Sequence, residues 1–183
     1  HKDASTIDAG SACFVDLRSK SDLASITAIN VENPNCLFFL ASDATIPDVL
    51  NGRNVVKGST AESITLTNGN NFYTPIAFVA NNISFKRTFT IGAGESSGWH
   101  SLVLPFAVTS VKTGEKTLDW FHRSYDTGKN FWLKTFISDE PDYVYFDYVD
   151  DNVMKANTPY IIAVPDDRFG TKWQLTGKEM TFS

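Results

Sequence analysis

The chain has 183 residues, of which 42% are hydrophobic, 20% are charged and 13% are aromatic. These values are ordinary for a folded globular protein, and the length suffices for one or two small domains with hydrophobic cores. The formal net charge of −5 offers no basic surface for phosphates, and no apolar run approaches the roughly 20 residues of a membrane-spanning helix. We therefore expect no nucleic-acid partner and no direct membrane insertion.

Residues 1–70 contain short apolar segments separated by Asn, Asp, Gly, Ser and Pro. The segments that we interpret as strands are 26–31, 36–40, 54–56 and 64–66. Between residues 29 and 40 an Asn-rich corner separates two of them, as in one turn of a solenoid. Cys13 and Cys36 lie 23 positions apart, which is within the period of leucine-rich repeats. Three repeats cannot be aligned, so an irregular β-region is the alternative to the end of a solenoid.

The two cysteines, Cys13 and Cys36, belong to no CxxC motif and form no disulfide framework. We interpret them as buried small side chains, which is the usual behaviour of free cysteine. Export from the cell would also permit a disulfide between them. The sequence leaves their pairing open.

From residue 71 onward the strand patterns are clearer. In residues 83–91 the odd positions are Ile, Phe, Arg, Phe and Ile and the even ones are Ser, Lys, Thr and Thr, which is the period of a half-buried strand. We expect Arg87, on the apolar face, to pair with an acid at the sheet edge or to extend to solvent. Residues 92–98 are rich in Gly and Ser and predict a hairpin loop before a strand at 99–106.

The remaining segments continue the same pattern. Strands are predicted at 118–123, 130–137, 143–149, 160–164, 172–175 and 179–182, with turns at 125–128 and 139–142. Helix signals are poor, and residues 113–124 would form at most a short helix. The side chains expected to face the core are Leu102, Leu104, Phe106, Tyr160, Ile162 and Val164.

Many short strands joined by turns are typical of an all-β fold. For residues 71–183 we predict a jelly-roll-like β-sandwich. For residues 1–70 we predict an irregular short-strand segment that is solenoid-like or a remnant of leucine-rich repeats.

Two phrases carry a family resemblance. They are Trp99–Phe106 (WHSLVLPF) and Ala156–Pro165 (ANTPYIIAVP), with Ile83–Thr90 before them and Lys129–Phe136 (KNFWLKTF) between them. Together they resemble a β-sandwich module of exported surface proteins of Bacteroidetes-type gut bacteria, which often follows leucine-rich repeats near the end of a long chain. Asn54–Leu66 resembles the link between repeat and sandwich in that family, so the resemblance covers residues 25–183.

The resemblance implies export, a secreted or cell-surface location, and a role in adhesion or display. It implies no catalytic residues. The first residue is His1 and the last residues, Met180–Ser183, read as part of a strand. We therefore expect a fragment of a longer protein whose signal peptide has been removed or lies outside this sequence.

The sequence offers no catalytic set. The histidines are His1, His100 and His122, and no G-x-S-x-G motif accompanies them. The acids Asp139, Glu140, Asp142, Asp147, Asp150 and Asp151 are close in sequence. We interpret most of them as turn residues, with a paired-carboxylate hydrolase as a remote alternative.

No cofactor is predicted. The same acids could supply oxygen ligands to Ca²⁺, but Asp150-Asp151-Asn152 lacks the D-x-D-x-D-G pattern. No His or Cys pair has zinc-ligand spacing. The glycine-rich residues 92–98 precede a strand and not a helix, so they do not predict a phosphate-binding loop.

The aromatic excess is the remaining indication of function. The candidate contact residues are Trp99, Trp120, Trp132, Tyr143 and Tyr145, because exposed rings beside polar groups bind sugars or protein partners. A well-filled core would explain the same residues without any binding role.

Our leading hypothesis is a non-enzymatic module of an exported cell-surface protein that supports adhesion or display through its loops and an aromatic-lined face. A carbohydrate-binding module is the alternative, and a hydrolase the second alternative. The partner would be a host or bacterial surface protein or a glycan.

Overall fold

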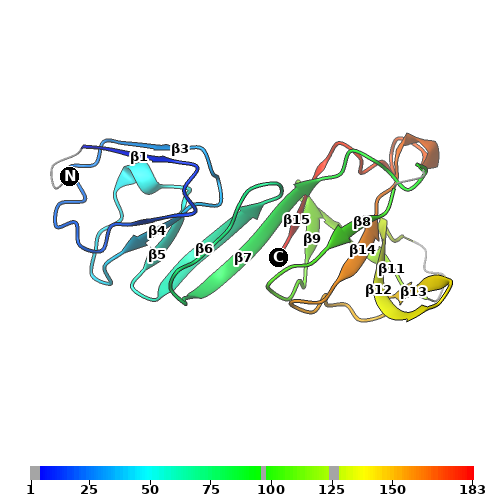
Figure 1. Cartoon of the computed structure of the whole chain (residues 1–183). Coiled ribbons are helices and arrows are strands. Elements are labelled where there is room, and N and C mark those ends of the chain that lie inside the picture. The colour runs from blue at the N-terminus through cyan, green and yellow to red at the C-terminus, as the bar shows by residue number, and fades with distance from the viewer. Residues whose placement is uncertain (1–4, 96–97, 124–127) are drawn as a thin grey trace. The chain divides into compact units, whose positions relative to one another are not determined.

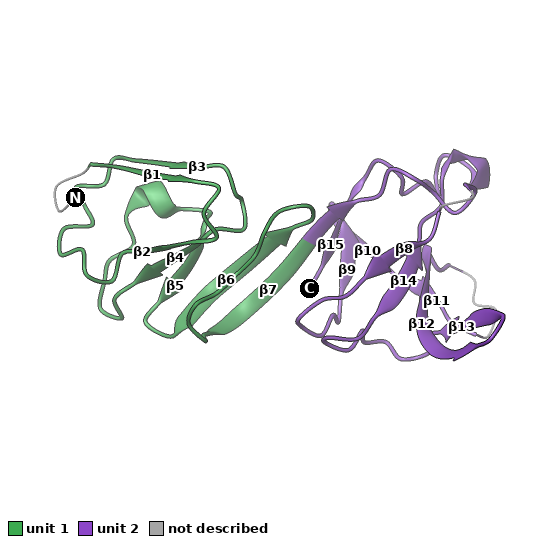
Figure 2. Ribbon diagram, viewed as in Figure 1, with its two compact units in different colours: residues 1–85 green, residues 86–183 purple. Residues whose placement is uncertain are grey.

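The computed structural model describes residues 5–95, 98–123 and 128–183. Within these residues the regular structure consists of strands and two single-turn 3₁₀ helices, so the predicted all-β class is confirmed (Figure 1). The chain divides into two compact units, residues 1–85 and 86–183 (Figure 2). The sequence had placed this division between residues 70 and 71. The strand β7, Val79–Thr88, contains the boundary.

Unit 1 consists mainly of short strands. They are β1 (Thr6–Gly10), β2 (Phe14–Asp16), β3 (Ala28–Val31), β4 (Leu37–Leu40), β5 (Asn54–Lys57), β6 (Thr60–Thr67) and most of β7, with the 3₁₀ helix η1 (Asp48–Leu50) before β5. The strand β1 pairs with β3 in parallel, and β2, β4 and β5 also pair in parallel. Successive coils of the chain thus stack on one another in a solenoid-like arrangement.

The stack ends after β5. Gly58 has a φ of 62°, a left-handed conformation that glycine adopts without steric cost, and the chain reverses there so that Lys57 pairs with Thr60 in antiparallel β6. Before β5 the chain runs through η1 and not through a strand equivalent to β1 and β3. This partial third coil explains why three similar repeats could not be aligned in the sequence.

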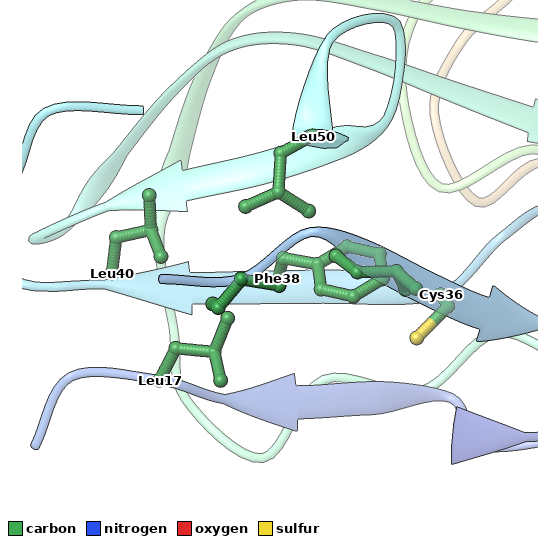
Figure 3. Close-up of a cluster of buried hydrophobic side chains, with 7 residues drawn as sticks. Leu17, Cys36, Phe38, Leu40 and Leu50 are labelled. Atoms are coloured by element: carbon green, nitrogen blue, oxygen red, sulfur yellow. The ribbon is translucent and has the colours of Figure 1, made fainter. Parts of the chain in front are cut away.

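The interior of the coils is apolar. One cluster contains Leu17, Ile26, Ile29, Cys36, Phe38, Leu40 and Leu50 (Figure 3). A second cluster, with Leu37, Phe39, Val56 and Ile64 among its members, lies on the other face of β4. All four residues of β4 are buried, as expected for a strand that is covered on both sides.

Unit 2 contains the other strands. They are β8 (His100–Leu102), β9 (Val111–Thr113), β10 (Lys116–Leu118), β11 (Trp120–Phe121), β12 (Phe131–Glu140), β13 (Tyr143–Tyr148), β14 (Tyr160–Ala163) and β15 (Glu179–Phe182), with the 3₁₀ helix η2 (Asp167–Phe169) after β14. One sheet has the order β10-β9-β15 and continues with the end of β7. The other has the order β11-β12-β14-β8, and β13 pairs with β12.

Both sheets of unit 2 bury one face. Five of the six side chains expected in the core are buried, namely Leu102, Leu104, Tyr160, Ile162 and Val164, and Phe106 is partly buried. No acid among the described residues pairs with Arg87: its Nη1 donates to the carbonyl oxygen of Ser101, and its guanidinium lies over the Phe89 ring. Burial lowers the pKa of Arg87.

Several boundaries differ from the prediction. Residues 172–175 do not form a strand: the backbone N–H of Trp173 donates to Gly170 in a turn, and that of Leu175 donates to Pro165. The stretch 113–124 contains no helix in its described part: β9 and β10 form a hairpin there around Gly114, which has a φ of 54°. Most of the turn expected at 125–128 lies outside the described residues.

Candidate binding surface

The alternation of side chains along β12 gives its sheet two different faces. Phe131 and Leu133 are fully buried, whereas Trp132 and Lys134 are partly exposed. In β14, Ile162 lies opposite Leu133 and is buried, and Ile161 lies opposite Lys134 and is partly exposed. Since cross-strand partners share a face, one side of the sheet belongs to the core and the other faces outward.

The outward side carries aromatic residues from several strands and from the segments beside them. We call this set the outer aromatic face; it consists of Trp99, Phe121, Trp132, Phe136, Phe146, Tyr148 and Phe169. The sequence had proposed Trp99 and Trp132 from this set.

Strand pairing brings the first members together. Phe121 lies opposite Trp132 in the parallel pair β11–β12, and their rings are stacked at 5.4 Å with an interplanar angle of 18°. Phe146 lies opposite Phe136 in the antiparallel pair β12–β13, and these rings meet edge to face at 6.2 Å and 77°. The register of β12 with its neighbours therefore builds the surface.

A lysine lies among the rings. The Nζ of Lys134 is 4.7 Å from the centroid of the Tyr148 ring and 5.6 Å from that of Trp99. Cation–π attraction of this kind holds an ammonium group over aromatic faces. No carboxylate of the described residues forms an ion pair with Lys134.

The rings of this surface are not coplanar. Trp132 is covered on one side by Phe121, and the ring of Phe169 is tilted by 55° to Trp132 at 5.3 Å. Trp99 is 45% exposed, and Phe136 and Phe169 are similarly exposed. The surface therefore presents ring edges and faces in several directions.

Tyr143 and Tyr145 lie elsewhere. Beyond a register shift between Phe136 and Ser138, both tyrosines are on the side of the β12–β13 ribbon opposite Phe146. They are 55% and 47% exposed, and their rings meet edge to face at 4.9 Å. Hydrogen bonding to Tyr143 raises the pKa of the Tyr145 hydroxyl. They extend the aromatic surface of the ribbon but do not join the outer aromatic face.

Trp120 does not contribute to the surface. It is only 5% exposed, and its indole N–H donates to the carbonyl oxygen of Val149 at 2.9 Å. The role that the structure gives this candidate contact residue is packing in the core of unit 2.

Three of the six acids that lie close in sequence form ion pairs. Arg123 pairs with Asp147 and Asp150, and Lys155 pairs with Asp151. Within residues 5–95, 98–123 and 128–183, no three His, Cys, Asp or Glu side chains are grouped as metal ligands. The Nε2 of His100 lies 2.9 Å from the carbonyl oxygen of Ile91.

Two hollows lie in unit 1. One of about 650 Å³ is lined by residues of η1, β5 and β6, with Glu62 as its only carboxylate. Another of about 610 Å³ contains Asp22 and Asp43, but Asp22 accepts the backbone N–H of Ser25 and so serves a local turn. Neither resembles the facing pair of carboxylates that glycoside hydrolysis requires.

Sequence reasoning missed most of the outer aromatic face. Trp132, Lys134 and Phe136 alternate along one predicted strand, and this alternation was a signal that the three share a side. The members from β11, β13 and η2 could not be added, because their approach depends on strand pairing between distant segments.

Comparisons with known proteins give no relative. No protein-family model matches the chain, and no curated protein or solved structure is significantly similar to it. In the part of the chain that the structure describes, no helix has both the length and the apolar character needed to cross a membrane.

Proposed function

We propose that the chain is a non-enzymatic module of an exported cell-surface protein and that it acts in adhesion or display. In this proposal the outer aromatic face of unit 2 contacts a partner protein. The observation that carries it is the concentration of partly exposed rings on the outward side of one sheet. Aromatic residues of this kind are enriched at the energetic centres of protein interfaces.

The geometry of the rings supports a protein partner over a glycan. A sugar ring stacks on a flat aromatic surface and forms hydrogen bonds around it. Here Phe121 covers Trp132, and Phe136 meets Phe146 edge to face, so neither pair offers two coplanar free rings. An apolar surface whose rings point in several directions suits the side chains of a protein better than it suits a sugar ring.

The finer fold is part of the proposal. We infer that unit 2 is a jelly-roll-like β-sandwich, since each of its two sheets buries one face. We infer further that the solenoid-like coils of unit 1 correspond to the end of a leucine-rich-repeat region, in keeping with the phrases that resemble a module of exported bacterial surface proteins.

Binding assays with designed variants test the proposal. The chain, immobilised on beads, is presented to a panel of purified extracellular-matrix proteins and to a glycan array. The informative variant combines Trp99→Ala with Phe136→Ala, which removes two exposed rings of the outer aromatic face. The control is Tyr73→Ala in unit 1, where the ring is 58% exposed but lies outside that face.

We expect binding to at least one protein of the panel, weakened about tenfold or more by the double variant because central interface aromatics contribute about 2 kcal/mol or more. Tyr73→Ala should leave binding unchanged. Binding to glycans alone, lost in the double variant, would replace the proposal by the carbohydrate-binding alternative. Absence of any binding, or a hydrolytic activity on the glycans, would contradict it.

A further inference from the structure

The two cysteines lie at equivalent positions of successive coils. In the parallel pair β2–β4, Phe14 lies opposite Leu37 and Val15 lies opposite Phe38. Cys13 and Cys36 directly precede Phe14 and Leu37, so the same register places them opposite each other. The backbone continues this pairing, because the N–H of Leu37 donates to the carbonyl oxygen of Cys13 at 2.9 Å.

Cys36 is on the inner side of the coils, and the register places Cys13 on the same side. Cys36 belongs to the apolar cluster that also contains Phe38, and Val15 packs against the same cluster. Cys13 is two residues before Val15 and therefore shares its side of the chain. In Figure 3 the sulfur of Cys36 points toward β2, the strand that ends just before Leu17.

We propose that Cys13 and Cys36 are a disulfide-forming pair that covalently joins the first two coils of unit 1. Residues opposite each other on adjacent strands have Cα atoms about 4.8 Å apart, and disulfides span Cα separations of about 4.4–6.8 Å. Both thiols are free in the structure. This inference is independent of the proposed function.

The surroundings of the two thiols indicate that they lie close together and that Cys13 reacts before Cys36. Burial, and next to it the neighbouring Cys13, raise the pKa of Cys36 to about 11. Cys36 is only 2% exposed, whereas Cys13 is partly exposed. Since the thiolate is the reactive species, Cys13 is the residue that meets an external oxidant first.

The oxidant is a disulfide, such as glutathione disulfide. The Cys13 thiolate attacks one of its sulfurs, the S–S bond of glutathione disulfide breaks, and one glutathione thiolate leaves. The Cys36 thiolate then attacks the Cys13 sulfur of the mixed disulfide, and the second glutathione leaves. The two cysteines lose two electrons and two protons, and the oxidant is reduced to two glutathione molecules.

The test is refolding of the whole chain from denaturant in a buffer of reduced and oxidised glutathione, which gives both thiols access to the oxidant. We expect an intact mass lower by two hydrogen atoms, no reaction with iodoacetamide, and a linked peptide pair containing Cys13 and Cys36. The melting temperature should be higher than that of the reduced protein by about 5–10 °C, since closing a loop of this length constrains the unfolded chain.

Two variants serve as controls. Cys13→Ser leaves the buried core intact, and its melting temperature should not respond to reductant. The melting temperature of Cys36→Ser should likewise not respond to reductant. Two free thiols after refolding of the wild-type chain, a stable glutathione adduct on Cys13, or a disulfide between two chains would each overturn the proposal.

Discussion

Asp166 makes several hydrogen bonds in unit 2. Its carboxylate accepts hydrogen bonds from the backbone N–H and side chain of Arg168 and from the backbone N–H of Gly94. Arg168 also pairs with Glu95 at 3.1 Å. A Cβ added at Gly94 would meet the guanidinium of Arg168, which would have to shift. The carboxylate thus ties the loop after Ile91 to η2.

These contacts predict a pH dependence of stability. Hydrogen bonds from the Arg168 side chain are the main reason that the pKa of Asp166 is lowered. A carboxyl whose pKa is lower in the folded state stabilises the fold above its unfolded pKa of about 3.9, and this contribution is lost as the pH falls through the folded value. Asp166→Asn should therefore lower the melting temperature at neutral pH, and the difference from wild type should shrink below about pH 4.

The matched control for this measurement is Asp151→Asn. Asp151 is exposed and pairs only with Lys155 at 3.6 Å, and exposed pairs contribute little. Its melting curve should follow the wild type at every pH. A difference between Asp166→Asn and wild type that is constant across the pH range would contradict the role assigned to this carboxylate.

At the level of elements, buried asparagines connect the coils of unit 1 with the hairpin that follows them. The Nδ2 of Asn35 donates to the carbonyl oxygens of Thr67 and Asn70, and its Oδ1 accepts the N–H of Thr67. Asn54 bonds both backbone groups of Thr65 in the same manner. These amides substitute for a backbone partner at positions where the sheet ladder is interrupted.

Removing one of these amides should be costly. Asn35→Ala removes three hydrogen bonds that the buried amide makes to backbone groups of Thr67 and Asn70, and each such bond contributes about 0.5–1.5 kcal/mol. We expect the free energy of unfolding in urea to fall by about 2–4 kcal/mol. Asn70→Ala is the control, because its exposed side chain donates only to Asn68; an equal loss in both variants would show that the buried amide has no special role.

The elements also show how far the sequence could be interpreted. Period-two alternation correctly predicted the strand that contains Ile83 and the inward direction of Leu102 and Ile162. It failed at residues 172–175, which were predicted as a strand but whose backbone N–H groups donate to Gly170 and Pro165 and not to a neighbouring strand. The alternation pattern indicates which side chains share a side of a strand. It does not indicate whether another strand is available to pair with it.

Strand pairing, which alternation does not reveal, matters even more for the candidate surface. Trp120 and Trp132 look alike in sequence, yet Trp120 is buried and Trp132 lies on the outward side of the sheet. Their difference arises from the short parallel pairing of β11 with β12, in which Trp120 lies opposite the buried Phe131. Pairing between segments separated by a loop is set by tertiary packing, and single-sequence patterns do not encode it visibly.

At the scale of the whole molecule, the two units have separate cores. Both apolar clusters around β4 consist of residues no later than Phe85, and the division of the chain follows that residue. The buried residues of β12 and β14 belong to unit 2. Since each unit buries its own apolar side chains, each has the means to fold as its own cooperative element.

This organisation predicts that a substitution in the core of one unit destabilises that unit and not the other. Phe38→Ala in unit 1 and Leu133→Ala in unit 2 each remove a fully buried side chain, at a cost of about 2–5 kcal/mol. Hydrogen exchange followed by mass spectrometry should show faster exchange within residues 5–85 for the first variant and within the described part of residues 86–183 for the second, with the other unit unchanged. Ile46→Ala, at an exposed position, should alter neither. Faster exchange throughout the chain in both core variants would mean that β7, which crosses the boundary, couples the units into one cooperative structure.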